Sequence, residues 1–170
     1  MFKKALAYSC TLLPLVAMAS SDGLVVAKNE SAKTLSSAQY AYVPIVIMMD
    51  NEGKQSVEIT GQYKSYVQEQ KGQPSISYSH YLKELANNLI ADGFTIATKC
   101  LTDCSTKPYL KTVENSFRYN NIYQLGYKNV RKNRFGYLSA VKEEKGGRQA
   151  IQVFAKNDYR DALKYTYEQI

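Results

Sequence analysis

Two cysteines separated by three residues are the side chains in this sequence best suited to do chemistry. They are Cys100 and Cys104, in the stretch TKCLTDCSTK. Two thiols at this spacing can bind a metal, exchange electrons or close a disulfide. A zinc site needs three or four ligands, and a thiol redox motif has two residues between its cysteines rather than three. The choice therefore depends on the other ligands in the chain and on the compartment.

The N-terminus predicts export from the cytoplasm. Two lysines precede an apolar run from Ala5 to Ala17, and Ala17 and Ala19 are small residues at the positions that a signal peptidase reads. The run is shorter than the ~20 residues that span a bilayer. We therefore interpret residues 1–19 as a cleaved signal peptide rather than a membrane anchor.

Cleavage changes what the chain has available for chemistry. It removes Cys10 and two lysines, which lowers the formal net charge from +7 to +5, and it leaves His80 as the only histidine. Close thiols in an oxidising compartment form disulfides. We predict that Cys100 and Cys104 form a structural disulfide, with no metal and no cofactor. Closing so small a loop stabilises by about 2 kcal/mol, so we expect the bond to pin a turn without holding the domain together.

The remaining sequence has the length of one domain. We expect a flexible lead-in at residues 20–37, followed by a single domain at residues 38–170. Apolar alternation and turn signals predict strands at 42–50, 56–67, 94–100, 134–143, 148–156 and 161–170. The last of these also fits a helix, and we prefer a strand. Consecutive strands late in the chain favour an α+β fold: an antiparallel sheet of about five to six strands with one main helix, and a second short helix at 112–125, on one face.

The main helix is predicted between about Tyr78 and Asp92. Ser77 is a suitable N-cap, and Gly93 stands where a left-handed C-cap residue belongs. One apolar stripe at helical spacing should pack on the sheet, and its leucines are Leu82, Leu85 and Leu89.

The order of these elements resembles the exported Gram-negative family called domain of unknown function 4892. The motifs that carry the resemblance are ADGF before a strand, the close cysteine pair, and the hairpin RFGYLSAVKEEKGGRQAIQVFAKND. It covers about residues 42–170. The cysteines stand one residue closer together than the family leads us to expect, and Ser105 replaces a frequent glycine. Members often precede an OmpA-like domain, which the residues up to Ile170 do not contain, so peptidoglycan anchoring does not carry over. The resemblance implies a compartment and a fold but no catalytic residues.

The residues themselves predict no catalytic site. His80 falls near the back of the apolar stripe, and the adjacent Ser77 and Ser79 suit capping better than nucleophilic attack. Gly146–Gly147 suits a hairpin turn rather than a phosphate-binding loop. Glu143–Glu144 lie among lysines at the same turn, which favours a solvated loop over an acid–base pair.

Basic and aromatic residues gather in YKNVRKNRFGY, residues 127–137. Such mixtures can bind nucleic acid, but export argues against that partner, and anionic lipid or lipopolysaccharide is the candidate instead. A solvated basic loop is the alternative. The fifteen tyrosines indicate strand packing, with a tyrosine-rich binding face as the alternative. The candidate anionic-surface residues are Lys128, Arg131, Lys132 and Arg134.

These observations favour a non-enzymatic module of the periplasm or cell envelope that binds an envelope component or a protein partner. Association with the outer membrane is compatible with them. The alternative is a small envelope hydrolase or transferase whose site is not recognisable. No later apolar segment is long enough to span a bilayer, so we expect a protein that is not transmembrane.

The basic residues generate a test of membrane binding. Each basic residue near an anionic surface contributes about 1 kcal/mol, and the attraction fades within a Debye length. We expect the mature protein to bind vesicles containing anionic lipid at low ionic strength and to dissociate near physiological salt. Changing Lys128, Arg131, Lys132 and Arg134 to glutamine should abolish binding in a vesicle co-sedimentation assay with little change in melting temperature. Binding that ignores salt would contradict the prediction.

Overall fold

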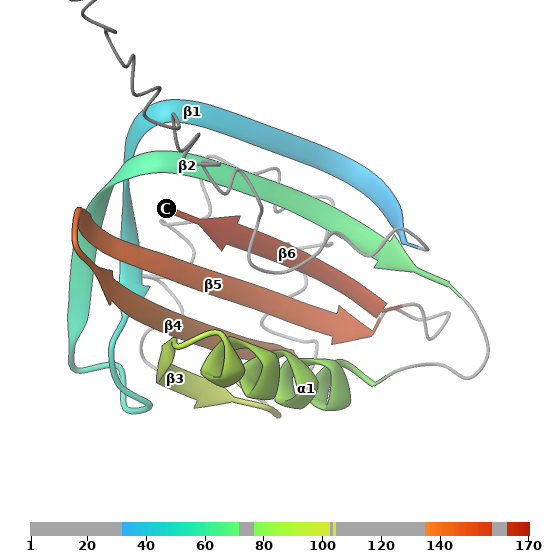
Figure 1. Cartoon of the computed structure of the whole chain (residues 1–170). Coiled ribbons are helices and arrows are strands. Elements are labelled where there is room, and N and C mark those ends of the chain that lie inside the picture. The colour runs from blue at the N-terminus through green and yellow to red at the C-terminus, as the bar shows by residue number, and fades with distance from the viewer. Residues whose placement is uncertain (1–31, 72–76, 103, 105–134, 158–162) are drawn as a thin grey trace, which may run out of the picture.

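The computed structural model describes residues 32–71, 77–102, 104, 135–157 and 163–170. These residues form an α+β fold with one helix and one antiparallel sheet. The strands are β1 (Lys33–Met48), β2 (Ser56–Gln70), β3 (Thr95–Cys100), β4 (Gly136–Glu144), β5 (Gly147–Asn157) and β6 (Leu163–Gln169), and the helix is α1 (Tyr78–Ala91). In space the strands follow the order β1-β2-β6-β5-β4-β3, and every neighbouring pair is antiparallel (Figure 1). The α+β class with one main helix is therefore confirmed.

Helix α1 lies across one face of β3, β4 and β5, which we call the helix face (Figure 1). Its predicted ends are confirmed, because the Ser77 Oγ accepts the backbone N–H of His80 at 3.2 Å and Gly93 adopts a φ of +85°. The predicted apolar stripe is confirmed as well. The leucines that pack on the sheet are Leu82, Leu85 and Leu89, all buried.

A glycine on β4 allows the helix to approach the sheet closely. A Cβ atom at Gly136 would collide with Leu82 Cδ1 and would lie 3.1 Å from the carbonyl oxygen of Cys100. The second of these neighbours is backbone and cannot turn aside. Gly136 therefore leaves room for Leu82 of α1 and for the backbone of Cys100 at the end of β3.

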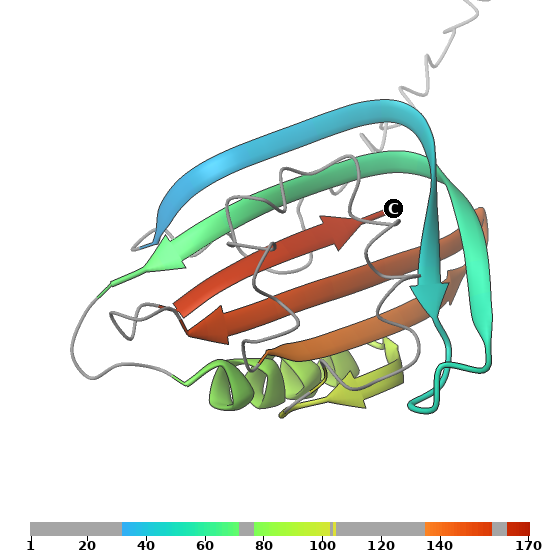
Figure 2. The same cartoon turned by 180° about the vertical axis from the view of Figure 1, so that it is seen from behind.

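The β1–β2 hairpin is long and bends over the opposite face of the sheet, the back face. Figure 2 shows the last part of β1 running down in front of that face. The pairing with β2 shifts between Tyr40 and Val43, which lies opposite Gly61, so β1 carries an extra residue at this point. Such a bulge bends a strand and increases its twist. The bent end buries a cluster against the sheet, whose members are Val43, Ile45, Ile47, Tyr63, Val141, Ala150 and Ile170.

Strand β1 begins earlier than the sequence predicted. Residues 33–37 were expected in the flexible lead-in, but they pair with β2, with Ser36 opposite Val67 and Ser37 opposite Tyr66. Small polar residues form a strand here because β2 supplies backbone hydrogen-bond partners. The segment therefore lacks the apolar alternation by which a strand is predicted from sequence. The preference for a strand at the C-terminus is confirmed by β6. The predicted signal peptide and the predicted helix at 112–125 lie outside the described residues.

The packing of α1 gives a stability test. Leu85 is 4% exposed, whereas Lys83 faces solvent. Leu85→Ala should lower the free energy of unfolding by about 2–5 kcal/mol through lost burial and a cavity, and Lys83→Ala should change it by less than about 0.5 kcal/mol. Urea unfolding followed by circular dichroism measures both. Equal losses from the two variants would contradict this packing.

Candidate functional site

Both faces of the central strands are covered. Gly136–Val141 of β4 and Ala150–Lys156 of β5 are runs of consecutive buried residues. Alternate residues of these runs pack against α1 or into the clusters of the back face. Four tyrosines of the sheet are buried in the same way, Tyr63, Tyr66, Tyr137 and Tyr165. A broad tyrosine-rich binding face is therefore not formed by these four residues, and packing is their role.

Polar side chains form a buried row on the back face between two apolar clusters. Thr98 pairs with Ser139 across β3 and β4, and Ser139 pairs with Gln152 across β4 and β5. All three are fully buried. Gln152 Oε1 accepts the hydroxyl of Tyr137 at 2.9 Å. Ser65 of β2 is also buried, and its hydroxyl makes no hydrogen bond within the part of the chain that the structure describes.

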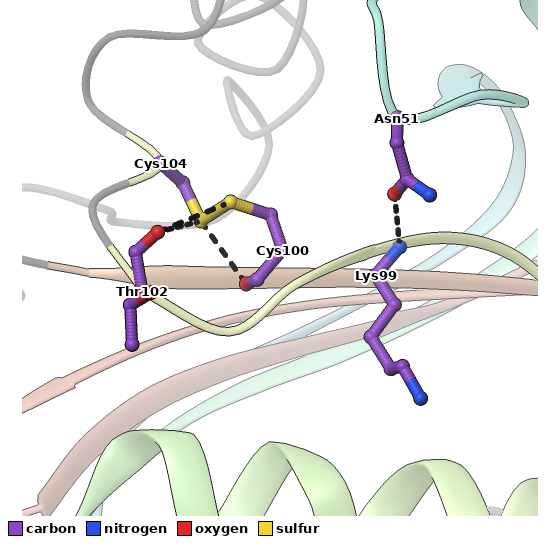
Figure 3. Close-up of a disulfide and its surroundings, with 5 residues drawn as sticks. All are labelled: Asn51, Lys99, Cys100, Thr102 and Cys104. Carbon is purple, nitrogen blue, oxygen red and sulfur yellow. Dashed lines mark hydrogen bonds between the residues drawn. A yellow bond between two sulfur atoms is a disulfide. The ribbon is translucent and has the colours of Figure 1, made fainter.

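The row holds the bent end of the hairpin through contacts that we call the clasp. The carbonyl oxygen of Met48 accepts the Thr98 hydroxyl at 3.0 Å and the Ser139 hydroxyl at 2.6 Å. The Thr98 hydroxyl also lies 3.0 Å from the carbonyl oxygen of Asp50. The backbone N–H of Lys99 donates to Asn51 Oδ1 at 2.7 Å (Figure 3). Both hydroxyls serve as donors to backbone carbonyls, so they are structural rather than nucleophilic here.

The turn between β1 and β2, next to the clasp, is held by the side chain of Asp50. Its carboxylate accepts the backbone N–H groups of Glu52 at 2.6 Å, Lys54 at 3.2 Å and Gln55. Desolvation by burial raises the pKa of this carboxyl, but the hydrogen bonds from backbone N–H groups between residues 52 and 55 outweigh it, and the pKa is lowered overall. The ionised side chain therefore holds the turn in shape.

Cys100 and Cys104 are joined in a disulfide, with the two sulfur atoms 2.11 Å apart (Figure 3). Both residues are buried in an apolar cluster that includes Phe135, Phe154 and Met48. The backbone N–H of Cys104 donates to the carbonyl oxygen of Phe135 at 3.2 Å. The disulfide at the end of β3 is therefore part of a buried apolar cluster that also contains Met48, the last residue of β1.

The described residues are poorly arranged for acid–base or nucleophilic chemistry. His80 is exposed on α1, on the helix face, whereas the buried hydroxyls lie on the back face. Burial raises the pKa of the Tyr165 phenol to about 12 and also raises that of Tyr66, so both stay protonated near neutral pH. Among the described residues, no group of three His, Cys, Asp or Glu side chains could hold a metal ion.

The candidate anionic-surface residues are not brought into this site. Lys128, Arg131, Lys132 and Arg134 all lie outside the described residues. Over the part of the chain that is described, no helix is long and apolar enough to cross a membrane.

The two edges of the sheet differ in how they are covered. On β3, the N–H of Lys99 is capped by Asn51 from the hairpin turn, and Thr98 is bonded into the clasp. On β1, among the described strands, β2 is the only neighbour. Two aromatic side chains of β1 face solvent, Tyr40 at 44% and Tyr42 at 77% exposed. The first half of β1 is therefore the candidate binding surface, and we call residues 34–42 the open edge.

Sequence reasoning missed both the clasp and the open edge. Ser139 stands inside the apolar run YLSAV, where a lone hydroxyl on a buried strand signals a need for a nearby acceptor. The stretch TLSSAQYAY, residues 34–42, has no charge and no proline, which is uncommon for an edge strand. No protein-family model matches the chain, and no curated protein matches it. The resemblance to domain of unknown function 4892 stays a prediction.

The Asp50 turn predicts a pH-dependent contribution to stability. Because the folded-state pKa is lowered, the carboxylate stabilises the fold at pH values above its ordinary pKa of 3.8 and loses that effect as the pH falls through the folded-state value. Asp50→Asn replaces an acceptor at Gln55 by a donor, so it should lower the melting temperature at pH 7.

The difference in melting temperature between wild type and Asp50→Asn should then shrink as the pH falls below 3.8. Glu58→Gln, at an exposed carboxylate of β2, is the matched control for loss of one negative charge. A deficit for Asp50→Asn that is the same at pH 7 and at acid pH would show that the carboxylate charge does not hold the turn.

Proposed function

We propose that this chain is a non-enzymatic module of the bacterial cell envelope that binds a polypeptide partner along the open edge of β1. The observation that carries the proposal is the difference between the two sheet edges. The hairpin turn covers β3 through Asn51, while the open edge has only β2 beside it among the described strands.

An edge strand is a template for strand addition wherever its outer side is accessible. It presents backbone N–H and C=O groups to an extended segment, whose main chain supplies affinity and whose alternate side chains supply specificity. Natural proteins usually protect such edges with lysine, proline or a short strand. The β1 strand has sixteen residues, and its open edge, residues 34–42, has neither charge nor proline.

The exposed aromatics strengthen this assignment. Tyr42 lies at the bulge where β1 bends, and the Tyr40 ring packs at a tilt against the buried Tyr63, with 5.9 Å between the ring centroids. Tyrosine gives a binding surface a large contact area at low entropic cost. An extended segment that pairs with the open edge would meet both rings.

The non-enzymatic class is supported by where the reactive side chains lie. Ser139 and Thr98 donate to carbonyl oxygens, both cysteines are in a disulfide, and His80 faces solvent on the other side of the sheet. The envelope location is supported by the signal-peptide pattern of residues 1–19 and by the close cysteine pair.

Position-specific cross-linking tests the proposal in the native compartment. A photo-reactive residue in place of Tyr42 should cross-link to a polypeptide, whereas the same residue in place of Asn87, which is exposed on α1, should not. Ser37→Lys places a charge in the open edge at an exposed position and should suppress the cross-link from position 42. Equal cross-linking from both positions, or a cross-link that Ser37→Lys leaves unchanged, would exclude the open edge as the binding surface.

A further inference from the structure

We infer that the Cys100–Cys104 disulfide is a redox-sensitive switch, whose reduction releases the tip of the β1–β2 hairpin while the rest of the sheet stays paired. Thr98 and Lys99 hold the hairpin tip, and the next residue of β3, Cys100, carries the disulfide. Figure 3 shows the hydrogen bond at Lys99 beside the disulfide on the same strand. Such a switch is independent of the proposed function and needs no partner on β1.

The end of β3 has few other attachments. Strand β3 lies at the edge of the sheet, with β4 as its only neighbour among the described strands. Its pairing shifts between Ile96 and Thr98, so the regular ladder at this end consists of the residues from Thr98 to Cys100. Segments with few contacts open more readily than central strands. The disulfide at Cys100 is therefore one of the main contacts that keep Thr98 and Lys99 in place.

The core gives a second connection between the disulfide and the hairpin tip. Both cysteines pack in the apolar cluster that contains Met48, and the carbonyl oxygen of Met48 accepts the Thr98 and Ser139 hydroxyls. Two thiols need more room than one disulfide, because non-bonded sulfur atoms stay at van der Waals separation. A closely packed interior has little free volume to absorb this change. Reduction should therefore displace Met48 or Cys100, and either displacement weakens the clasp.

The remaining elements are held away from the disulfide. Helix α1 packs in a cluster whose buried members include neither cysteine. Strand β4 pairs with β5 along its whole length, and β5 continues through antiparallel ladders into β6 and β2. We therefore expect the opening to be confined to the end of β3 and the hairpin tip.

Thiol–disulfide exchange is the reaction that operates the switch. Cys100 is 8% exposed and Cys104 is fully buried, so a thiolate of a small dithiol such as dithiothreitol attacks the Cys100 sulfur. A mixed disulfide forms, and Cys104 leaves as a thiolate that takes up a proton. The second thiolate of the reagent then attacks the reagent sulfur of the mixed disulfide and releases Cys100. The disulfide gains two electrons and two protons from the reagent, which is oxidised to its cyclic disulfide.

Amide hydrogen exchange measured by NMR tests the switch on the mature protein, with and without dithiothreitol. The N–H of Lys99 donates to Asn51, and the N–H of Met49 donates within the hairpin turn. Both should exchange roughly tenfold faster or more after reduction. The N–H of Phe94, which donates to the last turn of α1, should keep its rate. Alkylation with iodoacetamide and mass spectrometry verify that both cysteines are reduced.

Three results of this measurement would each overturn the switch. The disulfide could resist dithiothreitol for as long as the protein is folded. Lys99 and Met49 could keep their protection after full reduction, which would show that the disulfide and the clasp are not coupled. The amide of Phe94 could lose protection together with the other two, which would show that the disulfide holds the whole domain.

Linkage gives a second measurement, which a disulfide uncoupled from the clasp would not change. If reduction weakens the clasp, weakening the clasp must favour reduction by the same factor. Thr98→Val removes the hydroxyl that donates to Met48 and Asp50, and it should shift the equilibrium with dithiothreitol roughly tenfold toward the reduced protein. Thr98→Ser keeps the hydroxyl, and Thr60→Val changes an exposed threonine of β2, so both should match wild type. An equilibrium that Thr98→Val leaves unchanged overturns the inference.

Discussion

The carbonyl oxygen of Met48, which accepts hydroxyls from both Thr98 and Ser139, is the contact on which the rest of this structure depends. The β1–β2 hairpin bends away from the plane of the sheet, and at the end of β1 Met48 still pairs with Ser56, so the carbonyl oxygen of Met48 takes its side-chain donors from other strands. Two hydroxyls on β3 and β4 provide donors at that position. With the tip held there, the apolar residues of the bent end, among them Ile45 and Ile47, become buried.

The hydrogen bonds that hold the hairpin tip at Met48 also explain why the two sheet edges differ. The turn after β1 carries Asn51 to the backbone of Lys99, so holding the hairpin tip also caps β3. The bulge that allows the bend divides β1 into a folded half, which starts at Val43, and a straight half, which forms the sheet edge. The cap on β3 at Lys99 and the division of β1 at the bulge are two consequences of one bent hairpin.

The packing also limits what kind of function the described residues can support. Buried hydroxyls donate to main-chain carbonyls, the cysteines are oxidised within the core, and burial keeps the phenols of Tyr66 and Tyr165 protonated near neutral pH. These groups contribute to stability, and using one of them in a reaction would break a contact on which the fold relies. The open edge would bind a partner through backbone groups, so binding there would not break these contacts.

The sequence alone determined the elements whose signals are local. The α1 stripe and its caps at Ser77 and Gly93 were readable, because helix periodicity and capping depend on residues within one or two turns. The pairing of Cys100 with Cys104 was a prediction from proximity in the chain and from the compartment. The tertiary structure decided the rest: the bend at the bulge, the burial of the disulfide, the role of Ser139, and the extension of β1 to Lys33. Each of these joins residues far apart in the sequence, as Ser139 and Met48 are, and no local pattern records which acceptor a buried hydroxyl will meet.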